Sequence, residues 1–275
     1  MALLSENTLW IFLSASKFNE FEEHHVNNIA KGIESLEIHN INPNNIAIFI
    51  DGDEQIIRDK LKMTLQKTYS LYSIAPSKEL LKLMLNCFYE NVVVFVTGHG
   101  DLNGIYDYTP NKLLNTLTKG NLNKNLIIYF GQCYSHAFHN TSFKNLNNIA
   151  MFGVNTKRSV VCKLPKERFA YTIFLYYLFE WIRNLKNNTL PDNRTVFSSV
   201  NYAKEQTQNQ IKEIMNHNKQ LEQKIITKLQ KVKQDSKEYV KLTLDLEEII
   251  KNTNIDNINT WFNAEGLSLA YRLKF

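Results

Sequence analysis

The chain has 275 residues, 44% of them hydrophobic, which is enough for one large domain or for a domain with an appendage. Its net charge of +5 at pH 7 is modest, and no dense cluster of lysine and arginine is interleaved with aromatic residues, so nucleic-acid binding is disfavoured. The three cysteines, Cys87, Cys133 and Cys162, are odd in number and lack the spacing of metal ligands, which argues against both a disulfide framework and a zinc site.

The first residues, MALLSENTLWIFLSAS, predict a strand rather than a signal peptide, because they lack a basic leader and because Glu6 and Asn7 interrupt the apolar residues. No stretch approaches the roughly 18 apolar residues that a membrane span requires. We therefore expect no membrane partner and a reducing compartment, with the protein either cytoplasmic or exported without a cleaved signal peptide.

The first two thirds of the chain alternate between two kinds of segment. Short apolar runs rich in β-branched and aromatic residues predict buried strands, and segments with apolar residues at helical spacing predict helices. This alternation indicates an α/β fold with a mostly parallel central sheet. The expected strands are 9–13, 46–50, 92–96, 126–130 and 149–154, and the expected helices include 22–38, 56–65, 77–90, a segment after Thr109-Pro110 and 167–185.

From residue 195 to 252 the chain contains no glycine or proline, and apolar residues recur every three or four positions. This predicts one or two long amphipathic helices with a bend near 234–236, which either pack on the domain as an insertion or form an arm for a partner or for self-association. Residues 267–275 alternate between apolar and polar, which predicts a final strand. The expected organisation is a core over 1–200, a helical segment over 201–255 and a return segment over 256–275 that packs on the core.

Two residues suited to nucleophilic catalysis follow neighbouring predicted strands. His99 comes just after the strand 92–96, and Cys133 comes just after the strand 126–130. Because parallel strands end at the same edge of a sheet, we expect the two side chains to meet there and to act as base and thiol nucleophile. Gly100 follows the histidine directly, so the backbone N–H groups of Gly100 and Cys133 are candidate oxyanion donors. The alternative is a buried packing cysteine beside a structural histidine.

The motif TGHG at 97–100, followed by a strand that ends in GQCYS at 131–135, resembles the caspase-like cysteine peptidases of clan CD. The likeness is greatest to the legumain and glycosylphosphatidylinositol-transamidase group. It extends over 8–18, 22–29, 42–53, 148–159 and 167–182. The resemblance implies a caspase-like three-layer sandwich with a C-terminal helical insertion or arm. It also implies a cysteine endopeptidase that cuts polypeptides and needs neither cofactor nor metal.

The resemblance also implies where a substrate binds, although this chain departs from the group in places. Many members carry an acidic residue or Gln two positions before the nucleophile, where this chain has Gly131, with Gln132 adjacent to the cysteine. The Arg-His pair that opens the first helix of the group corresponds to Glu23-His24 or His24-His25. From the residues alone this segment is a solvated helix start, because adjacent histidines do not share a helix face and make an improbable metal pair.

Further candidates line the same predicted edge. Ser14 either orients the catalytic histidine or caps a loop. Ser135 and Asn155 follow two strand ends, and Lys157 or Arg158 either favours an acidic substrate side chain or is solvated.

Two further segments have two interpretations each. The tip Asp51-Gly52-Asp53 is either a tight turn after a strand or a cation site. The loop 101–110, with its two tyrosines, either forms a wall of the substrate cleft or is an ordinary surface loop.

The expected reaction is peptide-bond hydrolysis through a thioester on Cys133. Transamidation uses the same site, with an amine in place of water. A catalytically silent scaffold that binds a partner through its C-terminal helices is the alternative. A small nucleotide-binding protein is disfavoured, because no glycine-rich phosphate loop occurs.

Overall fold

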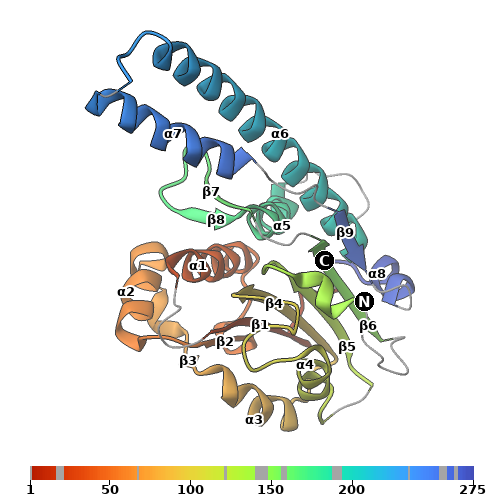
Figure 1. Ribbon diagram of the computed structural model, residues 1–275. Helices are drawn as coiled ribbons and strands as arrows, with labels where there is room; N and C mark the ends of the chain where they lie inside the picture. The colour runs from red at the N-terminus through yellow and green to blue at the C-terminus, as the bar shows by residue number, and fades with distance from the viewer. Residues whose placement is uncertain are drawn as a thin grey trace.

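The computed structural model describes residues 2–16, 22–66, 68–120, 123–139, 148–155, 160–187, 194–234, 236–253, 259–262 and 266–275. Figure 1 shows helices on both faces of a central sheet and a long helical hairpin that projects from one side. The fold is therefore α/β, as the alternating patterns of the sequence predict.

The central sheet has seven strands among the described residues, in the order β3-β2-β1-β4-β5-β6-β9. The first six in this order run parallel, and β9 pairs antiparallel with β6. A separate antiparallel pair, β7-β8, lies beside α1. The strands are β1 (Thr8–Ala15), β2 (Ile46–Ile50), β3 (Ile74–Ala75), β4 (Asn91–Gly98), β5 (Asn125–Phe130), β6 (Ile149–Asn155), β7 (Val161–Lys163), β8 (Ala170–Thr172) and β9 (Asn259–Phe262).

The three central strands β1, β4 and β5 are buried along their whole length. Because strand side chains alternate between faces, each strand contributes to two separate cores. On β4, Val93 and Phe95 belong to one core, while Val92, Val94 and Val96 belong to the other. The continuous apolar runs that predicted these strands therefore reflect a sheet covered on both faces.

The two cores are closed by different helices. One core contains side chains of α1, α2, α5, the beginning of α6 and α8, and the other contains those of α3 and α4. The helices are α1 (Glu23–Glu37), α2 (Glu54–Leu65), α3 (Leu80–Leu85), α4 (Pro110–Leu117), α5 (Ile173–Asn184), α6 (Val196–Leu229), α7 (Lys237–Thr253) and α8 (Leu267–Arg272). The expected helix 77–90 is shorter, since a 3₁₀ turn precedes α3 and the helix ends at Leu85.

The strand order reverses between β1 and β4. From β1 the chain continues outward to β2 and β3, with α1 on one face, and from β4 it continues in the other direction to β5, with α4 on the opposite face. In open α/β sheets a ligand crevice forms outside the carboxyl ends of the strands at such a switch point. Here that position lies next to the paired residues Ala15 and Gly98, directly before His99.

The predicted long helices are present as α6 and α7, which pack against each other and are joined around the predicted bend. Thr195 caps α6 by accepting a hydrogen bond from the backbone N–H of Ser198, at 3.1 Å. Along α6 the last buried side chain is Ile211, and no described side chain of α7 is buried. Beyond Ile211 the described side chains of the hairpin are at most partly buried, and α6 and α7 pack mainly on each other, although Met215 still packs against the core.

The prediction of a strand over 267–275 is wrong, because most of this segment forms α8. Leu269, Ala270 and Leu273 are buried, and this spacing is that of one helix face rather than of a strand. The apparent alternation in the sequence comes from half-exposed positions on the other face. No helix in the described part of the chain is long and apolar enough to cross a membrane.

Candidate functional site

The loops after β4 and β5 meet at the carboxyl edge of the sheet. Val96 pairs with Phe130, and the backbone N–H of Gly131 donates to the carbonyl of Val96 at 2.9 Å. Beyond the strands, Gly100 approaches the backbone of Cys133 so closely that any β-carbon at position 100 would overlap the Cys133 carbonyl oxygen. The loop that carries His99 therefore touches the loop that carries Cys133.

Backbone turns place both residues at the mouth of the sheet. Gly98 has a φ of +120°, a conformation that side-chain-bearing residues rarely adopt, and the chain turns there at the end of β4. Tyr134 has a φ of +52° and opens a 3₁₀ turn over Ser135–Phe138, so the chain turns immediately after Cys133. Cys133 is half-buried, and the His99 side chain is 38% exposed, so a substrate can reach this part of the surface.

A second histidine, His25, lies against this site. It belongs to the first turn of α1, its side chain is 3% exposed, and its ring centroid is 5.4 Å from that of His99 in an edge-on arrangement. Its Nδ1 lies 3.0 Å from Oγ1 of Thr97, the second-to-last residue of β4. Burial, with smaller contributions from His24 and His99, lowers the pKa of His25 well below 6.5, so its imidazole is neutral near pH 7.

The expectation of a solvated helix start is therefore wrong at His25. The rings of His24 and His25 lie close together, with centroids 4.0 Å apart and planes inclined by 55°. His25 turns inward toward the end of β4, where its ring also meets that of His99 from another element. The start of α1 is covered by the strand ends, which local periodicity does not reveal.

Glu22 joins the site from the residue that precedes α1. One carboxylate oxygen lies 3.4 Å from Nε2 of His99, and the other lies 2.9 Å from Nδ1 of His24. Sequence reasoning missed Glu22 and His25. The rule that brought His99 and Cys133 together, that parallel strands end at the same edge of a sheet, could have found them, because the segment after β1 also begins at this edge.

The remaining predicted site residues have different surroundings. Gly131 is buried, and a β-carbon there would come within 2.5 Å of the Leu175 side chain, which gives this glycine a packing role. Gln132 is buried, and neither the oxygen nor the nitrogen of its amide has a hydrogen-bond partner in the part of the chain that the structure describes. Ser135 is fully buried in the turn after Cys133.

Four of the predicted site residues remain. Ser14 is buried in β1 and pairs in register with Thr97. Asn155 ends β6, where it pairs with Asn259. Lys157 and Arg158 lie outside the described residues.

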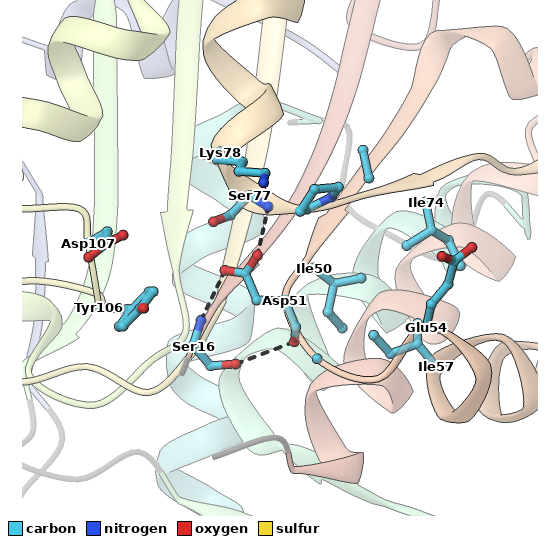
Figure 2. A pocket seen from close by; sticks show the side chains of 13 residues that line it. Ser16, Ile50, Asp51, Glu54, Ile57, Ile74, Ser77, Lys78, Tyr106 and Asp107 are labelled. Atoms are coloured by element: carbon cyan, nitrogen blue, oxygen red, sulfur yellow. Dashed lines mark hydrogen bonds between the residues drawn. The ribbon is translucent and has the colours of Figure 1, made fainter. Parts of the chain in front are cut away.

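A pocket of about 430 Å³ lies beside the site, over the ends of β1, β2 and β3 (Figure 2). The carboxylate of Asp51 accepts hydrogen bonds from the backbone N–H groups of Ser16 and Ser77, at 3.3 and 2.8 Å. Asp53 caps α2 by accepting from the N–H of Ile56 at 3.0 Å. Both acidic residues of the tip thus stabilise turns, which favours the tight-turn interpretation of this segment.

The loop after His99 supplies one wall of this pocket through Tyr106 and Asp107 (Figure 2). The other tyrosine of the loop, Tyr108, is buried and donates to the carbonyl of Ser77 at 2.7 Å. One tyrosine thus faces the pocket, and the other fixes the loop to the start of the α3 region.

The chain matches no model of a known protein family, and no curated protein matches it in sequence.

Proposed function

We propose that the protein is a caspase-like cysteine peptidase that hydrolyses peptide bonds with Cys133 as nucleophile and His99 as acid and base. The observation that carries this proposal is the contact of Gly100 with the Cys133 backbone, which brings the two loops to one place. That place adjoins the switch point of a parallel sheet, where ligands of such folds bind. The sequence motifs around both residues support the same class of peptidase.

The proposed reaction begins when the sulfur of Cys133 attacks the carbonyl carbon of the substrate while the thiol proton passes to His99. The backbone N–H groups of Gly100 and Cys133 then stabilise the oxyanion. His99 gives its proton to the departing amine, and an acyl-thioester remains on Cys133. Water, activated by His99, releases the acid and regenerates the thiol. An amine in place of water gives transamidation.

Glu22 has a supporting role in this reaction. Its carboxylate oxygen, 3.4 Å from Nε2 of His99, lies close enough to stabilise the imidazolium that forms when His99 takes a proton. The pocket lined by Tyr106 is a candidate volume for a substrate side chain (Figure 2). Recognition by Gln132, Asn155, Lys157 and Arg158 stays a prediction from the sequence.

A second candidate function, a silent scaffold that binds a partner, is favoured by one feature of the hairpin. On α7, Val240 and Leu244 lie one helical turn apart and are 56% and 59% exposed, and Ile226 of α6 is 40% exposed. Exposed apolar side chains on a projecting hairpin suit a protein partner.

Cleavage of a diverse peptide library, with every new end identified by mass spectrometry, separates the two candidates. The peptidase proposal expects cleavage by the wild type, none by Cys133→Ala, and unchanged cleavage by the matched variant Cys162→Ala. Cleavage that survives in Cys133→Ala would contradict it. A folded wild-type protein that cuts nothing and whose Cys133 does not react with an electrophile would favour the scaffold.

A further inference from the structure

Three side chains from two segments, the start of α1 and the loop after β4, converge at the switch point between β1 and β4. Glu22 precedes α1, His25 lies in its first turn, and His99 follows β4. Each places one ligand atom, a ring nitrogen or a carboxylate oxygen, within 4.8 Å of the ligand atoms of the other two. The cluster thus includes the histidine to which we assign acid–base chemistry.

The buried member of this cluster has a nitrogen without a partner. His25 is 3% exposed, its Nδ1 faces Thr97, and its Nε2 has no hydrogen-bond partner among the described residues. A buried unpaired nitrogen costs roughly 1–3 kcal/mol unless something binds it. Nε2 of His25 is therefore a nitrogen that a ligand of this site can satisfy.

The other side of the His25 ring has the support typical of a metal-binding histidine, whose second nitrogen donates to a fixed acceptor. The acceptor here is the Thr97 hydroxyl, which also accepts a hydrogen bond from Nδ2 of Asn28 at 3.1 Å. Asn28 is held in turn by Thr172, whose backbone N–H donates to Oδ1 of Asn28 at 3.0 Å. Donation from Nδ1 to Thr97 leaves the lone pair of Nε2 available to an ion.

We propose that Glu22, His25 and His99 bind a divalent transition-metal ion, best matched by zinc, which holds His99 and reversibly switches off the nucleophilic site. Two imidazoles and one carboxylate form a common zinc set, whereas calcium and magnesium prefer oxygen ligands alone. Two ligands of a tetrahedral zinc at about 2.0–2.1 Å lie about 3.3 Å apart. The Glu22 oxygen and Nε2 of His99, 3.4 Å apart, already have this separation.

The fourth position of such an ion is open to water or to the sulfur of Cys133. In either case His99 cannot exchange protons while its ring nitrogen is bound to the ion. The switching part of this proposal depends on the proposed peptidase function, whereas the binding part does not. The proposed metal site departs from the expectation, drawn from the sequence, that the site holds no metal.

The test is equilibrium binding of Zn²⁺ to the full chain, measured by competition with a chromogenic chelator, with Co²⁺ absorption spectra to report the ligands. We expect one tight site per chain in the wild type. Glu22→Gln and His25→Gln should weaken binding at least about tenfold, since even supporting residues of metal sites contribute that much. Glu22 is half exposed, so its variant folds even if His25→Gln does not.

Two further variants serve as controls. His217→Gln, which changes an exposed histidine of α6, should bind zinc like the wild type. Cys133→Ala should keep a tight site and lose at most the near-ultraviolet thiolate-to-cobalt band. Unchanged binding in Glu22→Gln and His25→Gln, or loss of binding in Cys133→Ala alone, would overturn the proposal.

The inhibition assay distinguishes this proposal from the proposed function. If both hold, Zn²⁺ blocks peptide cleavage by the wild type, and a chelator restores it. Tight zinc binding with the expected variant pattern in a protein that cuts no peptide would contradict the peptidase function and the switch, while leaving the metal site intact. Cleavage that is insensitive to zinc, with no tight binding, would refute the metal site alone.

Discussion

The carboxyl edge of the sheet and the α6–α7 hairpin are held together in different ways. At the edge, three fully buried strands position the loops, and His25 is buried at the start of α1 against Thr97 of β4. The distal half of the hairpin has no buried side chain among the described residues, and its two helices pack mainly on each other (Figure 1). Substitutions at the edge should therefore change the stability of the fold and the reactivity of the site. Substitutions in the distal hairpin should change little except local packing.

Phe95→Ala should give the largest effect on stability. The Phe95 ring in β4 stacks on Phe12 and Tyr129 and meets Phe179 edge-on, at centroid distances of 4.9–5.4 Å. Loss of a buried phenylalanine ring costs about 3–5 kcal/mol in the free energy of unfolding, which urea denaturation measures. Leu244→Ala in the hairpin is the matched control and should cost less than about 0.5 kcal/mol. Equal costs would mean that the hairpin is part of the same packed core.

Gly100→Ala should mainly reduce the reactivity of Cys133. The added methyl group overlaps the carbonyl oxygen of Cys133, so the two loops must separate. Misplacement of reacting groups by about 1 Å can reduce a rate roughly 100-fold. We expect such a loss in the rate at which an electrophile labels Cys133. Leu102→Ala, which removes an exposed side chain from the same loop, should keep the wild-type rate. A wild-type labelling rate in Gly100→Ala would show that the loop contact does not matter.

Glu34→Gln should have the smallest effect on stability of the three substitutions. It extends the comparison to charged side chains on the packed face of α1. Burial raises the pKa of Glu34 above its usual 4.5, although Lys31 and Arg183 oppose the shift. Because the folded state holds this proton more tightly, stability falls as the pH rises from 4.5 through the folded-state pKa. The variant should therefore be more stable than the wild type at pH 7 by less than about 1 kcal/mol, because the group is partly exposed and screened. Below pH 4 this difference should vanish.

Thermal denaturation at several pH values measures the Glu34 effect. Glu54→Gln is the control, since Glu54 pairs with Arg58 on the exposed surface of α2 at 2.7 Å. Its removal should give no stabilisation at pH 7. Stabilisation of similar size in both variants would mean that it reflects net charge rather than burial.

Much of the fold could be predicted because its signals are local. Each central strand is a continuous apolar run, since both faces of the sheet are covered, and the hairpin is a long stretch without glycine or proline. The meeting of the His99 and Cys133 loops follows from one topological rule applied to two strand ends.

The features that could not be predicted depend on contacts between segments that are far apart in the sequence. The periodicity of α1 places His25 on the face of Ile29 and Ile33, but its contact with Thr97, 72 positions further along the chain, cannot be derived from that periodicity. Residues 267–272 form the helix α8 because Leu269, Ala270 and Leu273 fill a core made by other elements. In the sequence alone, apolar and polar residues of this segment alternate as they do in a strand.

The most direct test of the central claim is the rate at which a thiol-directed electrophile labels each cysteine near pH 8, resolved by mass spectrometry in the wild type and in His99→Ala. Burial raises the pKa of Cys162 to about 11, so only about one molecule in 1,000 carries its thiolate at that pH. We predict that Cys133 reacts at least about tenfold faster than Cys162, and that His99→Ala slows Cys133 alone. A Cys133 that reacts no faster than Cys162, or at a rate unaffected by His99→Ala, would contradict the account.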